Sequence, residues 1–105
     1  MFDNKTEKLI RESVISEYVN ACKTYGEKYN SLHEGYAVLK EEIEEAKQEL
    51  EYLEDHFTSF WNSIKIDDKA SALADVRTVA FDAIRMAEEA VQVAAVVRKI
   101  LGGAE

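Results

Sequence analysis

The sequence predicts an all-α fold: a helical hairpin of two long helices plus an N-terminal helix, completed into a multi-helix bundle by oligomerisation. The 105-residue chain has no proline and only four glycines, so little interrupts a long helix. Apolar residues also recur at spacings of three and four along three segments, the pattern of a helix face that is buried. A chain of this length builds one core, so residues 1–105 are predicted to form a single domain.

The first helix is predicted from about Lys5 to about Tyr25. Asn4 and Glu7 resemble a capping box, in which side chains satisfy the backbone N–H groups of the first turn. Gly26 follows as a C-terminal stop, because glycine readily adopts the backbone conformation that ends helices. The apolar positions of this segment are Ile10, Val14, Tyr18, Ala21, Cys22 and Tyr25.

The second helix is predicted to start after Ser31, because Ser31 and Glu34 have the S-x-x-E form of a capping box. An apolar seam of about four heptads follows, and such a seam needs a helical partner. Its members are Tyr36, Leu39, Ile43, Ala46, Leu50, Leu53, Phe57, Phe60 and Ile64. Polar residues between positions 58 and 63 weaken the last turns, so the helix is expected to bend or end early there. The turn is predicted at residues 65–68.

The third helix is predicted to open at Asp67 or Asp68, both good N-cap types, and to run to Leu101, where two glycines stop it. It carries two apolar stripes, which indicates burial on two sides. One stripe reads Leu73, Val76, Ala80, Ala83, Ala87, Ala90, Ala94, Val97 and Leu101, and the other reads Val79, Met86, Val93 and Ile100. We therefore expect an antiparallel hairpin with the first helix packed on it, and a homodimer or higher homo-oligomer that covers the remaining apolar surface.

Charge and composition narrow the functional classes. The formal net charge is −8 and the isoelectric point is about 4.8, so plain nucleic-acid binding is not expected. A phosphate ligand would need a divalent cation to mediate its contact. The chain begins without an apolar signal core and has no apolar run of the roughly 18–20 residues that span a bilayer. Together with the single Cys22, this predicts a cytoplasmic protein with no membrane partner.

Acidic side chains crowd one stretch, HEGYAVLKEEIEEAKQEL, at residues 33–50. Glu41, Glu42 and Glu45 form the pattern E-E-x-x-E, and Glu42 and Glu45, three residues apart, can converge on one point. Hard cations such as Mg²⁺ take oxygen ligands of this kind. The alternative is the solvated face of an acidic helix, since residues 41–55 contain eight acids.

A second stretch, MAEEAVQVAAVVRKIL at residues 86–101, sets polar residues inside an apolar segment. Glu89 and Gln92 are again three residues apart, and buried polar groups need partners. In an antiparallel hairpin with its turn near residue 66, residue 42 pairs roughly with residue 90, which brings Glu42 and Glu45 to the height of Glu89. The alternative is that Glu88 and Glu89 are exposed and Gln92 is an ordinary interface amide.

HEGYAVLKEEIEE followed by EEAVQVAAVVRK resembles the MazG-like, all-α nucleoside triphosphate pyrophosphohydrolases, particularly their small phage- and prophage-type members. The resemblance covers about residues 25–101. The motifs of that family are E-E-x-x-E on one helix and E-x-x-D on the next. The resemblance implies an enzyme that binds Mg²⁺, or Mn²⁺, and hydrolyses a nucleoside triphosphate to the monophosphate and pyrophosphate.

Carried over, the resemblance implies metal ligands at Glu42, Glu45, Glu89 and Gln92. Glu41 would orient a ligand or accept the proton of the attacking water. Gln92 stands where the family has aspartate, which removes one negative charge and predicts weaker metal binding or a changed metal number. A second match, Ala72-Leu-Ala-Asp75, keeps the aspartate but loses the glutamate and lies nearer the turn, so the Glu89 register is preferred.

Two further residues are candidate substrate contacts. His33 lies at the N-terminus of the second helix, where it either approaches a base or phosphate or simply belongs to the cap. Lys40 is positioned to contact phosphates, or balances charge on an acidic helix. The competing functional class is a catalytically inactive helical-bundle interaction protein that retains the fold, and the Gln92 departure favours it.

Overall fold

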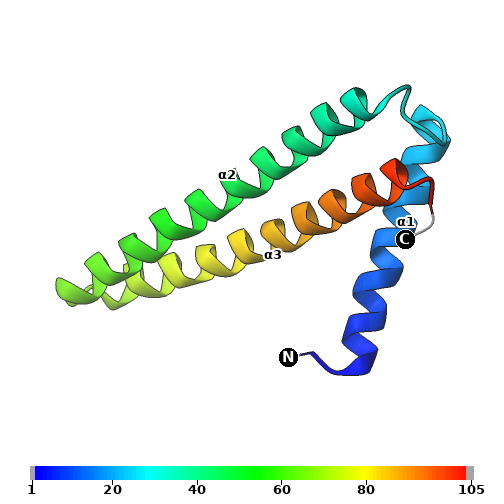
Figure 1. Cartoon of the computed structure of the whole chain (residues 1–105). Helices are drawn as coiled ribbons and strands as arrows, with labels where there is room; N and C mark the ends of the chain where they lie inside the picture. The colour runs from blue at the N-terminus through cyan, green and yellow to red at the C-terminus, as the bar shows by residue number, and fades with distance from the viewer. Residues whose placement is uncertain (1, 104–105) are drawn as a thin grey trace. The chain divides into compact units, whose positions relative to one another are not determined.

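The computed structural model describes residues 2–103, and these residues form three α-helices and no strand (Figure 1). The predicted all-α class is therefore confirmed. Helix α1 spans Asn4–Tyr25, α2 spans Leu32–Lys65 and α3 spans Lys69–Ile100. Each boundary lies within two residues of its prediction, and α2 continues through its polar last turns to Lys65 instead of ending early.

Short polar side chains start α1 and α3. The predicted cap at Asn4 was wrong by one residue, because Asn4 is already helical and Asp3 caps α1 by accepting a 2.7 Å hydrogen bond from the backbone N–H of Thr6. Hydrogen bonds from Thr6 hold the pKa of Asp3 below its usual range. Asp68 starts α3 in the same way, accepting from the backbone N–H and the hydroxyl of Ser71 at 3.0 Å and 2.8 Å.

Contacts group the chain into two compact units. Unit 1 contains α1, the first part of α2 up to Ile43, and the last part of α3 from Glu89 onward. Unit 2 is Glu44–Glu88, the remaining parts of α2 and α3 with the turn between them. Helices α2 and α3 each run unbroken through both units. That residues 1–105 form a single domain stays a prediction.

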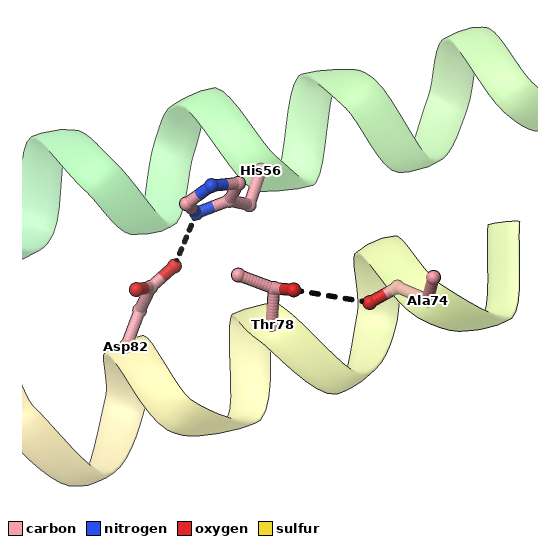
Figure 2. Close-up of polar contacts among 4 residues, drawn as sticks. All are labelled: His56, Ala74, Thr78 and Asp82. Atoms are coloured by element: carbon pink, nitrogen blue, oxygen red, sulfur yellow. Dashed lines mark hydrogen bonds and ion pairs between the residues drawn. The ribbon is translucent and has the colours of Figure 1, made fainter. Parts of the chain in front are cut away.

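Unit 2 is an antiparallel helical hairpin, as predicted (Figure 1). Two polar contacts join its helices. His56 Nδ1 of α2 lies 2.6 Å from the carboxylate of Asp82 of α3, whose side chain is only 5% exposed (Figure 2). Nearer the turn, the hydroxyl of Ser63 donates to Asp75 at 2.8 Å. These contacts fix the register of the two helices, since each joins one defined pair of positions.

In unit 1, α1 packs beside the last turns of α3, and the start of α2 approaches the same turns. The Arg98 guanidinium lies 5.5 Å from the centre of the Tyr18 ring of α1. Gly35 of α2 is buried against Ile100, and a side chain there would meet Ile100 carbon atoms at 3.0 Å. Within unit 1 the first helix therefore packs on the last turns of α3, a position along the hairpin that the sequence did not predict.

The two apolar stripes of α3 differ in burial. The longer one is mostly exposed, with Leu73 at 43% and Val76 at 38%. The shorter one, with Val79 and Met86 in unit 2, is half-buried. Within unit 2 the shorter stripe is therefore the one on the side of α2, because the polar contact of Asp82 with His56 turns that face of α3 toward α2.

The His56–Asp82 contact supports a stability prediction. Replacing His56 by Ala leaves the buried Asp82 carboxylate without its partner across the hairpin, and we expect the free energy of unfolding to fall by about 1–3 kcal/mol. Urea unfolding followed by circular dichroism measures the change. His33→Ala is the matched control, because His33 is exposed and lies at the start of α2. Equal unfolding midpoints for both variants and the wild type would contradict the prediction.

Candidate functional site

Carboxylates from the two motif segments come together in unit 1. An oxygen of Glu42 on α2 lies within 4.8 Å of an oxygen of Glu89 on α3. Glu45 follows Glu42 by three residues on the same continuous helix, and its carboxylate comes within the same distance of that of Glu42. Glu42 and Glu89 thus bring carboxylates from two helices of unit 1 together, and with Glu45, one turn further along α2, they are called the acid group.

The chemistry of the acid group fits a hard divalent cation. Glu42 and Glu89 are half-buried and Glu45 is exposed, so two of the three carboxylates lie partly out of water. Converging negative charges repel each other, and a cation with oxygen ligands relieves that repulsion. The alternative of a solvated helix face fits Glu45, which is exposed, but not Glu42 or Glu89, which are half-buried. These residues would therefore hold Mg²⁺ or Mn²⁺.

Gln92, at the position where the resembled family has aspartate, is tied to α1. Its amide nitrogen donates to a carboxylate oxygen of Glu17 at 2.9 Å, and both side chains are half-buried. Because the nitrogen is engaged, the amide oxygen is the ligand atom that Gln92 can offer to a cation. Glu17 was not predicted as a site residue. The available signal was its place in the apolar pattern of the first helix, three residues after Val14 and four before Ala21.

The other predicted site residues do not belong to the acid group. Glu41 is exposed and is not a member of the acid group found among the described residues. His33, in the first turn of α2, and Lys40 are exposed too. Asp75, the alternative aspartate, is engaged by Ser63 in the hairpin of unit 2, which favours the Glu89 register.

A further buried acid lies on α2. Glu49 is half-buried, and its Oε2 atom is buried without a hydrogen bond from any described residue. It stands seven residues after Glu42 and seven before His56, so these three side chains occupy one row of α2. This row was not predicted from the sequence, because the prediction for α2 followed its apolar seam. The seven-residue spacing of polar side chains was the signal that could have revealed it.

Comparisons of the chain with protein-family models, curated proteins and solved structures found no match. The likeness to MazG-like enzymes therefore rests on the two sequence segments and their residues alone. None of the helices formed by residues 2–103 combines the length and the apolar character required to cross a lipid bilayer.

Proposed function

We propose that this protein is a Mg²⁺-dependent nucleotide pyrophosphohydrolase that converts a ribo- or deoxynucleoside triphosphate to the monophosphate and pyrophosphate. One observation carries the proposal. Glu42 and Glu89 come from the two segments that resemble the two motifs of the MazG-like family, and their carboxylate oxygens lie within 4.8 Å of each other. Forty-seven positions separate these residues in the sequence, so the fold is what brings them together.

Each residue has a distinct part in the proposed reaction. Glu42, Glu45 and Glu89 hold the cation, with the amide oxygen of Gln92 as a neutral fourth ligand. When bound, Mg²⁺ would neutralise charge on the triphosphate and would activate a water molecule for attack at the α–β linkage. Glu41, exposed next to Glu42, orients a ligand or accepts the proton of that water. The hydrogen bond from Gln92 to Glu17 keeps the amide oriented.

The test is release of pyrophosphate from a panel of ribo- and deoxynucleoside triphosphates, with Mg²⁺ and with Mn²⁺. We expect release that depends on the metal and yields the nucleoside monophosphate. Circular dichroism confirms that the assayed protein is folded. Folded protein that releases no pyrophosphate from any nucleotide would contradict the proposal.

The competing function is a catalytically inactive helical-bundle interaction protein. The observation that favours it is Gln92, because an amide offers no negative charge to a cation. The half-buried Glu17 carboxylate beside Gln92 weakens this alternative, since it restores a negative charge to the neighbourhood of the site. The nucleotide panel separates the two functions.

We also propose that the chain forms a homodimer, through apolar surface of unit 2. Large apolar side chains stand exposed on the hairpin, and contiguous exposed apolar patches on soluble proteins mark interaction surfaces. They include Phe57, Trp61, Ile64, Leu73, Phe81 and Ile84. A second copy would cover this surface by packing its own hairpin against it in a helical bundle.

Light scattering coupled to size-exclusion chromatography tests the dimer. We expect a mass of twice the 11.9 kDa chain. Trp61→Glu places a charge within the apolar surface and is expected to shift the mass toward one chain. Asn62→Glu adds the same charge at the neighbouring exposed position and serves as control. A wild-type mass of one chain at high concentration would rule out the dimer.

A further inference from the structure

A hollow of about 390 Å³ lies in unit 1, between the α1–α2 connection and the end of α3. Lys28, Tyr29, Ser31 and Leu32 form one side, and residues 99–102 form the other. This volume lies in the range of small-molecule sites, which runs from about 300 to 1,000 Å³. It is lined by none of the residues of the acid group.

A buried cation lines the hollow. Lys99 is only 4% exposed, and its ammonium lies 4.4 Å from the centre of the Tyr29 ring. The aromatic face offsets part of the cost of burying this charge. Among residues 2–103, no carboxylate forms an ion pair with Lys99. A buried charge needs a partner of opposite sign. The ammonium of Lys99 therefore makes the hollow a favourable place for an anion.

Neighbouring groups reinforce this preference. Lys28 brings a second ammonium to the same hollow. The Ser31 oxygen accepts from the Glu34 backbone N–H at 3.1 Å, which leaves its hydroxyl hydrogen to donate. Ser31 also begins α2, and the start of a helix attracts negative charge. The nearby Glu34 carboxylate is held by the backbone and side chain of Asn30, at 3.3 Å and 3.0 Å.

The end of α3 does not cancel this charge. The carbonyl oxygens of Lys99 and Arg98 accept hydrogen bonds from Gly102 and Gly103, at 3.1 Å and 2.8 Å. Both glycines have a positive φ, which allows the chain to turn back and close the helix in this way. The carbonyl dipoles at the wall are thus already satisfied by the protein, so they do not demand a cation in the hollow.

We propose that the hollow binds the phosphate group of a small ligand, with Lys99 and Lys28 as its cationic contacts. Two point charges and a free hydroxyl donor suit a polyvalent oxyanion. Tyr29 lines the same hollow. Burial raises the pKa of its phenol, and the negative charges of Glu42 and Glu34 raise it further, so the phenol lies within the field of Glu42. The binding requires no metal and breaks no bond, so it goes beyond the proposed hydrolysis.

Calorimetric titration with inorganic pyrophosphate, in EDTA, tests the site on the full chain. We expect binding by the wild type and a loss of about tenfold or more in affinity for Lys99→Met, since a charge-assisted contact is removed. Lys28→Gln, in the exposed connection, is expected to weaken binding without disturbing the fold. Lys5→Met, exposed on α1, is the control and should bind like the wild type. A nucleoside monophosphate, titrated in parallel, distinguishes a nucleotide phosphate from free pyrophosphate.

The proposal is overturned if folded wild type binds neither probe, or if Lys28→Gln and Lys99→Met both bind like the wild type. Its failure is distinguishable from failure of the hydrolase, because no metal is present in the titration. A protein that binds pyrophosphate through Lys99 but hydrolyses no nucleotide would retain this site and lose the proposed activity.

Discussion

Replacing Glu42 by Gln is expected to reduce metal-dependent pyrophosphate release by about 10²–10³-fold. The carboxylate of Glu42 lies within 4.8 Å of that of Glu89 on α3, the pair that joins the two motif segments. The amide has the same shape but no charge, so the change removes electrostatic attraction for the cation and leaves the packing of a half-buried residue intact. Initial rates on the best nucleotide of the panel, at saturating Mg²⁺ or Mn²⁺, measure the loss.

Glu54→Gln is the matched control for this variant, because it makes the same change at an exposed position of the same helix. We expect it to keep the wild-type rate. The proposed site would be rejected if Glu42→Gln and Glu54→Gln released pyrophosphate equally fast. A loss confined to Glu42→Gln, in protein of unchanged helicity, would assign the metal to the acid group.

Local chemistry made the helix ends predictable from the sequence. Ser31 and Glu34 satisfy backbone N–H groups within a few residues of each other, so their spacing alone identified the start of α2. Gly26 ends α1 with a positive φ of 90° that a side chain would oppose. The approach of Glu42 to Glu89 could also be predicted from the sequence. The position of the turn determines which residues of the two antiparallel helices lie opposite each other.

Choosing between two apolar faces required tertiary information. Both stripes of α3 have the periodicity of a buried face, so spacing alone does not say which of them lies toward α2. The contacts of Asp75 with Ser63 and of Asp82 with His56 bring the other face toward α2 in unit 2. Asp75, Asp82 and Glu89 follow each other at intervals of seven residues, so they lie on one face of α3. These polar residues indicate which face lies toward α2, but a search for apolar seams does not consider them.

The pairing of Gln92 with Glu17 was not predictable in the same way. Seventy-five positions separate the two residues, and the contact depends on how α1 packs on α3. A glutamate within an apolar pattern indicates only that its carboxylate needs some partner. Sequence spacing on α1 carries no information about the height at which α1 meets α3, so the identity of that partner follows from the structure alone.

Divalent metal is expected to raise the thermal stability of the wild type markedly. Without metal, the carboxylates of the acid group repel each other, and a ligand that binds only the folded chain adds RT ln(1 + [L]/Kd) to its stability. Mn²⁺ at about ten times its dissociation constant therefore adds about 1.4 kcal/mol. For a domain of this size, that corresponds to an increase of about 6–11 °C in Tm. Thermal unfolding followed by circular dichroism, with NaCl at matched ionic strength as reference, measures the shift.

The Glu89→Gln variant separates a specific site from general screening of an acidic chain. Removing one of the repelling carboxylates should make the metal-free variant at least as stable as the metal-free wild type, because like charges at short distance disfavour the fold. The same change should abolish most of the shift with Mn²⁺, whereas Glu54→Gln should respond like the wild type. Screening alone would move all three proteins equally, since each retains most of the net charge of −8. Equal shifts, or coincident curves for the wild type with and without metal, would therefore exclude a cation site at Glu42 and Glu89.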